Sequence, residues 1–115
     1  MPKTITRDQL LSALSQHIGA KNGASVSQLV AQITGLDRID RIAEREIRRL
    51  VKELRLAGQH ICALPGSGYY MAATPEELQS TFEYLHQRAL TSLTQITRMQ
   101  NLADPDLRGQ LHLPT

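Results

Sequence analysis

Residues 41–55 read RIAEREIRRLVKELR, and a helix would sort this stretch into two unlike faces. At about 100° of rotation per residue, four apolar residues fall in one narrow sector with the spacing i, i+3, i+4, i+7: Ile47, Leu50, Val51 and Leu54. A sector of this kind is stable only when it is buried. The stretch therefore predicts an amphipathic helix with its apolar side against a core.

The opposite side of this helix is almost purely basic. It carries Arg41, Arg45, Arg48, Arg49 and Lys52, with Glu46 and Glu53 to one flank. A solvated helix more often alternates charges at i, i+4, so a face of one sign indicates a polyanion, most simply a nucleic acid. The alternative is a solvated face whose arginines pair with Glu44, Glu46 and Glu53.

Composition favours a small helical protein with a local basic region. The chain has 115 residues, of which 41% are hydrophobic, and this is typical of one small domain plus an extension. Because there is no Trp and only one Phe, the core must consist of aliphatic side chains, which suits packed helices. Residues 38–55 carry seven basic and four acidic groups, whereas residues 56–115 carry three and five.

Cys62 is the only cysteine, so the chain cannot form an intramolecular disulfide or a cysteine-cluster zinc site. No apolar run approaches the roughly 20 residues that span a bilayer, and Met1 to Thr6 lacks the apolar core of a signal peptide. We therefore expect a cytoplasmic protein, in a bacterium or a phage-infected cell, that makes no membrane contact.

No pattern typical of catalysis or of metal binding stands out. The sequence shows no Ser-His-Asp arrangement, glycine-rich phosphate loop or convergent carboxylate pair. His60 and Cys62 are too few ligands for a metal, and the other histidines have no partner at ligand spacing. We expect no enzyme activity, no cofactor and no metal.

Local signals predict three helices before residue 58. Thr6 with Gln9, and Ser25 with Gln28, form capping boxes at the start of the first two, and Asp40 caps the third. Gly35 and Gly58 suit the left-handed residue that ends a helix. The apolar stripe predicted for the first helix is Leu10, Leu11, Leu14 and Ile18.

A hairpin and a long helix follow. Residues 61–64 and 69–72 are short β-compatible runs on either side of the turn residues 65–68. Thr74, Pro75 and Glu77 then give a strong helix start. An apolar ridge continues along this helix, although Thr91, Thr94 and Thr97 leave a break near Thr91 open: Leu78, Phe82, Leu85, Ala89, Leu93 and Ile96.

This order of elements resembles the winged helix-turn-helix family. Residues 43–54 are similar to the recognition helices of bacterial winged-helix regulators, and Gly68-Tyr69-Tyr70 resembles the return strand of the biotin-repressor type. Residues 88–93 and 109–115 look like stretches of small phage and prophage winged-helix proteins. The turn at residues 35–40 is longer than the family's usual three or four residues.

The resemblance implies a mostly α fold with a small β-hairpin. We expect a winged helix-turn-helix domain at residues 1–73, a long C-terminal helix at 74–103 and a tail at 104–115. The implied function is sequence-specific binding of double-stranded DNA, as a transcriptional regulator or a phage-type control or replication accessory protein. The alternative is a winged-helix adaptor that binds proteins and makes no direct DNA contact.

In this family the recognition helix enters the major groove, with its N-terminal residues nearest the bases. Arg45, Arg48 and Arg49 are then candidates for bases, and Arg41 and Lys52 for phosphates. Ser25 and Ser27 at the second helix and Ser67 in the wing tip are further candidate DNA contacts. The wing tip lacks Lys and Arg, so we expect a weak wing.

The ridge of the last helix is expected to form a homodimer. A dimer would bury Leu78, Phe82, Leu85, Ala89, Leu93 and Ile96 and would present two recognition helices to DNA. The alternative is that this helix folds back over its own domain.

Overall fold

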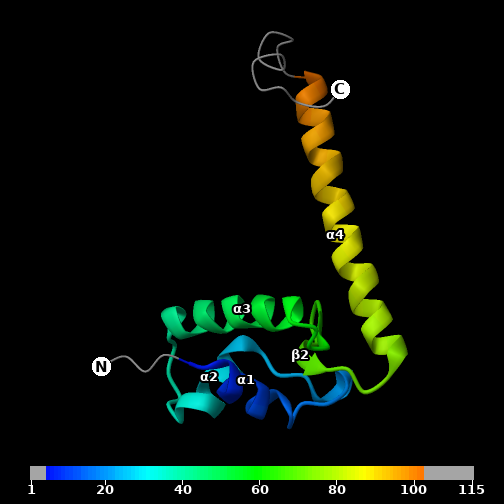
Figure 1. The fold of residues 1–115 in the computed structure, drawn as a ribbon. Coiled ribbons are helices and arrows are strands. Elements are labelled where there is room, and N and C mark those ends of the chain that lie inside the picture. The colour runs from blue at the N-terminus through cyan, green and yellow to red at the C-terminus, as the bar shows by residue number, and fades with distance from the viewer. Residues whose placement is uncertain (1–4, 103–115) are drawn as a thin grey trace. The chain divides into compact units, whose positions relative to one another are not determined.

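The structure, a computed structural model, describes residues 5–102. Its elements in chain order are α1 (Arg7–Leu14), the short 3₁₀ helix η1 (Ala20–Asn22), α2 (Val26–Thr34), α3 (Arg41–Leu56), β1 (Ile61–Leu64), β2 (Gly68–Met71) and α4 (Pro75–Leu102) (Figure 1). The fold is mostly helical, with one small antiparallel hairpin and a long C-terminal helix. This confirms the fold class predicted from the sequence.

The described residues form two compact units, which are divided between Thr81 and Phe82. The first turns of α4 belong to the first unit, so the boundary falls inside the helix, whereas the sequence placed it after residue 73. The predicted tail at residues 104–115 lies outside the described residues.

The helix ends follow the predicted caps. Thr6 and Ser25 each form a complete capping box, with Gln9 and Gln28 as the third residues of their helices. The carboxylate of Asp40 accepts the N–H of Ala43 at 3.0 Å. Because these bonds join residues three apart, local spacing is sufficient to predict them.

The predicted stripe of the first helix is wrong at Ile18. The helix α1 ends at Leu14, and Ile18 instead forms an isolated parallel bridge with Met71. The backbone around Ile18 is held to this strand residue, because Met71 donates to the carbonyl of His17 at 2.8 Å and accepts from Gly19 at 2.9 Å. Pairing with a distant strand therefore replaces the last predicted turn of helix.

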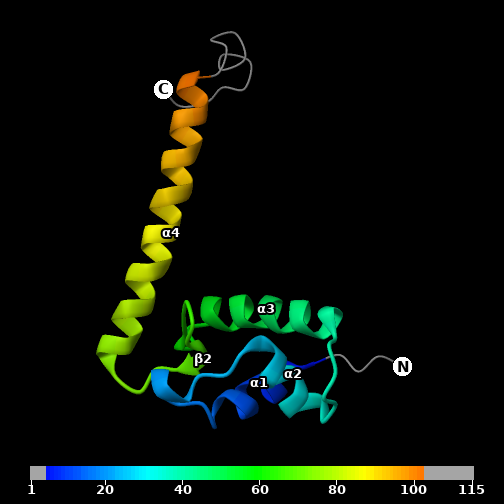
Figure 2. The same ribbon diagram turned by 180° about the vertical axis from the view of Figure 1, so that it is seen from behind.

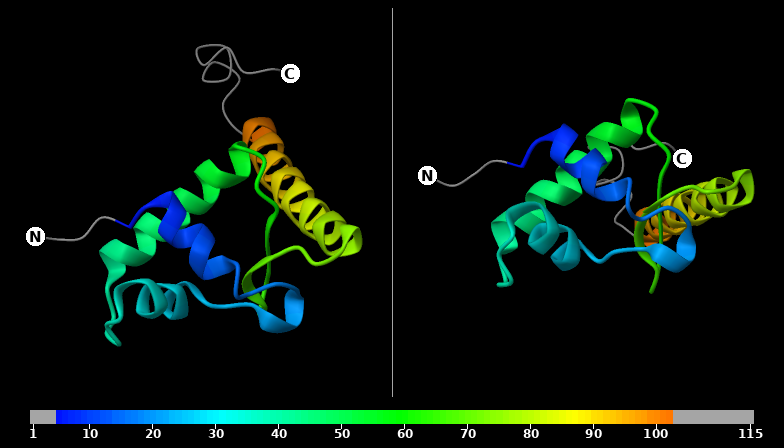
Figure 3. Two further views of the ribbon diagram at one scale, coloured as in Figure 1. Left: turned by 60° about the horizontal axis from the view of Figure 1, so that its bottom comes forward. Right: turned by 90° about the horizontal axis from the view of Figure 1, so that it is seen from below.

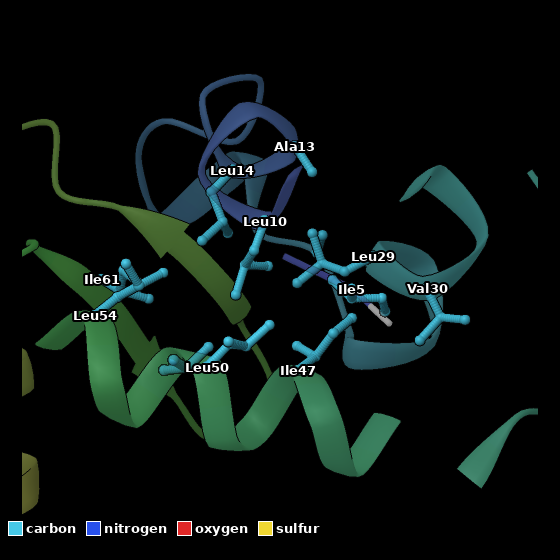
Figure 4. Packing of buried hydrophobic residues seen from close by; sticks show 12 residues of the cluster. Ile5, Leu10, Ala13, Leu14, Leu29, Val30, Ile47, Leu50, Leu54 and Ile61 are labelled. Carbon is cyan, nitrogen blue, oxygen red and sulfur yellow. The ribbon is translucent and has the colours of Figure 1, made fainter. Parts of the chain in front are cut away.

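One aliphatic core joins the elements of the first unit. Leu10 and Leu14 of α1, Leu29 of α2, and Leu50 of α3 point toward one another in Figure 4 and are almost completely buried. The same cluster includes Ile47, Leu54 and Ile61. Each such side chain contributes about 1.5–3 kcal/mol of burial free energy. The helix α3 packs against both α1 and α2 (Figure 3), so its orientation is fixed by this core.

The hairpin pairs β1 with β2 in antiparallel register, with Cys62 opposite Tyr70. β2 runs from Gly68 to Met71, one residue earlier than predicted at each end. Tyr70 is fully buried and Tyr69 is half-buried, as strand alternation predicts. Tyr69 also pairs with Ala24, the residue before the cap of α2, so the hairpin is tied to the start of α2.

The helix α4 runs without a break through Thr91 to Leu102 (Figure 2). Residues 76–102 contain no Gly or Pro, and each Thr costs at most about 0.7 kcal/mol of helix propensity relative to Ala. The described part of the chain contains no helix with the length and apolar character needed to cross a membrane.

Candidate nucleic-acid interface

The helix α3 presents its cations to solvent because its other side is anchored in the core. Ile47, Leu50, Val51 and Leu54 are buried, as predicted. Arg41, Arg45, Arg48, Arg49 and Lys52 are all exposed, and their spacing places them on the face opposite this buried sector. We call these five residues the α3 basic face. The structure therefore brings together the five cations on which the DNA-binding interpretation rests.

Three cations of the α3 basic face make no ion pair within residues 5–102: Arg41, Arg45 and Lys52. They follow one another at steps of four and seven residues, so they line one side of the helix. This line of positive charge is available to an anionic partner.

The other two cations are paired, so the prediction of an almost purely basic face needs correction at Arg48 and Arg49. Arg48 lies 3.6 Å from a carboxylate oxygen of Glu44. Arg49 contacts the carboxylate of Glu46 and lies 3.1 Å from that of Glu53. The alternative left open by the sequence, pairing with flanking glutamates, therefore holds for these two arginines. The Coulomb attraction is weakened by water because both arginine side chains are more than half exposed, so an incoming phosphate can replace the carboxylates.

The contact between Arg49 and Glu46 changes the pKa of both side chains. The hydrogen bond from Arg49, opposed by partial burial, lowers the pKa of Glu46 below its ordinary value. The same bond raises the pKa of Arg49. Glu46 therefore stays ionised at neutral pH and keeps Arg49 partly neutralised. Glu53 also lies 3.7 Å from Arg7, so one carboxylate bridges α1 and α3.

The three predicted serine contacts are already engaged within the fold. The hydroxyl of Ser25 accepts the N–H of Gln28 at 3.1 Å in the capping box. The hydroxyl of Ser27 donates to Glu44 at 3.4 Å, and that of Ser67 donates to the carbonyl of Leu64 at 2.9 Å inside the hairpin turn. A DNA contact by any of these side chains would require a shared or exchanged hydrogen bond.

The predicted dimerisation residues lie along α4, but they differ in exposure. Leu78 and Leu85 are half-buried, whereas Phe82, Ala89, Leu93 and Ile96 are exposed. Leu90 and Met99, which the predicted ridge omitted, are exposed as well. The structure therefore shows an apolar side of α4 in contact with solvent.

Sequence reasoning missed the apolar residues beside the basic face. Ile42 on α3 and Ile39 before it each expose 83% of their surface, and Leu36 in the preceding turn is also exposed. The helical position of Ile42 lies outside the buried sector, and this could have identified it. Arg38, also exposed in the turn, adds a further cation near the start of α3.

Among residues 5–102, no group of three or more His, Cys, Asp or Glu side chains is arranged to hold a metal ion. Comparisons with protein-family models, with curated proteins and with solved structures found no match to this chain.

Proposed function

We propose that the α3 basic face binds double-stranded DNA in the major groove. The observation that carries the proposal is the line of Arg41, Arg45 and Lys52, exposed on a helix that the core holds rigidly and unpaired within the described residues. A major groove admits an α-helix, and a guanidinium can bond O6 and N7 of guanine. The function supported best is sequence-specific recognition in the cytoplasm of a bacterium or phage-infected cell, as a transcriptional regulator or a phage-type control or replication accessory protein.

The five cations divide into roles by position and pairing. Arg45 lies near the N-terminal part of α3 and has no ion pair within the described residues, so it is the leading candidate for reading a base. Arg41 and Lys52 lie toward the two ends of the line and suit phosphates. Arg48 and Arg49 join the interface only when DNA replaces Glu44, Glu46 and Glu53 as their partner.

The test is a titration of duplex DNA at several salt concentrations with wild type, R45A and R98A. A base-reading arginine is worth about 1–3 kcal/mol, so R45A should weaken binding about five- to 150-fold and relax the selected sequence. Loss of Lys52 should weaken binding to all sequences and reduce the salt slope by about one. R98A removes an exposed arginine from α4 and serves as the charge-matched control.

Removal of the Glu46 carboxylate, which competes with DNA for Arg49, should change DNA affinity in the opposite direction to R45A. E46Q frees Arg49 from its closest partner, so DNA affinity should rise where R45A lowers it. If neither R45A nor E46Q changes affinity or salt slope relative to R98A, the α3 basic face is not the DNA site.

A protein adaptor is the second candidate, and the exposure of Leu36, Ile39 and Ile42 favours it. Leu36 and Ile39 precede α3, and Ile42 lies in its first turn beside the α3 basic face. A protein partner that has both acidic and apolar side chains would therefore fit this surface. A pull-down from nuclease-treated lysate distinguishes the candidates. A partner that survives nuclease treatment and is lost in I42A supports the adaptor, whereas loss of every partner on nuclease treatment counts against it.

A further inference from the structure

The helix α4 carries a series of large apolar side chains in contact with solvent. Five residues beyond Thr81 expose between 42% and 64% of their surface: Phe82, Leu90, Leu93, Ile96 and Met99. Contiguous exposed apolar surface of this kind marks an interaction site more often than isolated exposed residues do.

Six positions of α4 follow the spacing of a coiled coil. The steps between them alternate between three and four residues, and we call them the α4 seam: Phe82, Leu85, Ala89, Ser92, Ile96 and Met99. Alternation of three and four places residues a and d of a heptad on one side of a helix, where they pack against a second helix. Leu93 widens the apolar surface next to this seam.

The order of side-chain size along the α4 seam is the same in both directions. Two large residues, two small residues and two large residues follow one another. A second copy in antiparallel orientation therefore sets large against large and small against small. Phe82 meets Met99 of the second copy, Leu85 meets its Ile96, and Ala89 meets its Ser92. The contact of Phe82 with a methionine sulfur is favourable in itself.

Charge along α4 is compatible with the same pairing. No position of the α4 seam is charged, and Arg88 lies over the ring of Tyr84, 5.8 Å from its centroid. Glu83 and Arg98 follow or precede seam positions on the outward side of α4, so neither charge lies in the contact.

We propose that two copies of this chain pair in antiparallel orientation along the α4 seam. The exposed apolar side of α4 then packs against the same side of α4 in the second copy. The pairing does not depend on DNA binding by the α3 basic face, because it uses residues of the second unit alone.

Light scattering of the full chain, followed over a dilution series, tests the proposal. We expect a dimer mass for wild type and a monomer mass for I96E, because a buried glutamate on the seam has no partner. T94E is the matched control, since Thr94 is exposed on the same helix away from the seam, and its dimer should persist. A monomeric wild type, or a dimer that I96E leaves intact, overturns the proposal.

Disulfide formation tests the orientation and does not require a variant that breaks the dimer. A mixture of A89C and S92C chains should form the mixed disulfide in preference to either homodimeric one, because residues 89 and 92 meet only in antiparallel register. Wild type is the control, as its Cys62 is buried. Predominance of the disulfide between two S92C chains would instead indicate a parallel pair and would overturn the antiparallel proposal.

Discussion

Arg45 and Arg49 lie one turn apart on α3 and carry the same charged group, yet their surroundings differ. Arg49 is held by Glu46 and Glu53, whereas Arg45 has no ion pair within residues 5–102. Partial neutralisation of Arg49 leaves Arg45 as the more accessible charge for an approaching polyanion. If the α3 basic face binds DNA as proposed, the carboxylate of Glu46, three residues before Arg49, makes Arg45 the cation that meets DNA first.

Ile42 provides a prediction about base recognition. Its exposed side chain lies one turn before Arg45 and two turns before Arg49 on the same side of α3, where it can contact the methyl group of a thymine. Burial of one methyl group is worth about 0.8 kcal/mol, or about fourfold in affinity. Replacement of thymine by uracil in a selected DNA site should therefore weaken wild-type binding about fourfold.

The same replacement should leave the affinity of I42A unchanged, because that variant lacks the apolar contact. Titrations of the two DNA probes with both proteins measure this difference. Equal sensitivity of wild type and I42A to uracil would show that Ile42 does not read thymine, even if both proteins bind DNA.

The start of α4 is fastened to the rest of the first unit by Glu77. Its carboxylate accepts the N–H of Ala20 and the N–H of Ala73, each at 2.8 Å, while Thr74 caps the helix by accepting the N–H of Glu77 at 3.2 Å. These two bonds lower the pKa of Glu77. The bond from Ala20 has the largest effect, and the bond from Ala73 has the next largest. The ionised form is therefore the one that the folded protein prefers.

E77Q should unfold at a lower urea concentration than wild type at neutral pH. Because the pKa of Glu77 is lowered by folding, its stabilisation is complete above the unfolded-state value of about 4.3 and is lost as pH falls through the lower folded-state value. The gap between the two urea midpoints should therefore shrink in acid. E76Q removes the same charge from the neighbouring exposed position and should show no comparable gap. Midpoints of E77Q and wild type that agree at neutral pH would contradict this role.

The wing depends on close approach of two backbone segments. A Cβ added at Gly68 would lie 2.6 Å from the carbonyl oxygen of Ala24, and the φ of Gly68 is +73°. Tyr69 and Ala24 exchange backbone hydrogen bonds at 2.7 and 2.9 Å beside this point. A side chain here would both strain the backbone and separate the wing from the segment before α2.

G68A should therefore destabilise the protein more than G66A. Gly66 also has a positive φ, of +84°, but nothing lies within 4 Å of an added Cβ, so G66A bears only the left-handed strain of about 1–2 kcal/mol. Thermal unfolding of both variants measures the difference, and amide exchange at Tyr69 should accelerate in G68A alone. Equal melting temperatures would show that the segment before α2 can move away at little cost.

A dimer formed along the α4 seam would carry two α3 basic faces. If both proposals hold, wild type should protect two half-sites on DNA and bind them cooperatively. I96E should protect a single half-site with lower affinity, whereas T94E should retain the double footprint. Nuclease footprinting of the selected site checks this, and identical footprints for wild type and I96E would show that pairing along α4 does not serve DNA binding.

The sequence alone was sufficient for features governed by near neighbours. Helix starts at Thr6, Ser25 and Asp40 depend on bonds between residues three apart, and the buried sector of α3 depends only on helical spacing. The exposure of the five cations followed from that sector. Their pairing did not, because glutamates lie within reach of Arg48 and Arg49 on the same helix, and spacing alone allows these arginines to be either paired or free.

Contacts between segments that are far apart in the sequence leave no pattern in the local sequence. Only the folded structure shows them. The pairing of Ile18 with Met71, the close approach of Gly68 to Ala24 and the reach of Glu77 to Ala20, 57 positions away, appear only when the core brings these segments together. Spacing along a chain fixes which side chains share a face of a helix. The loops and the packed core fix which faces, backbones and charges then meet.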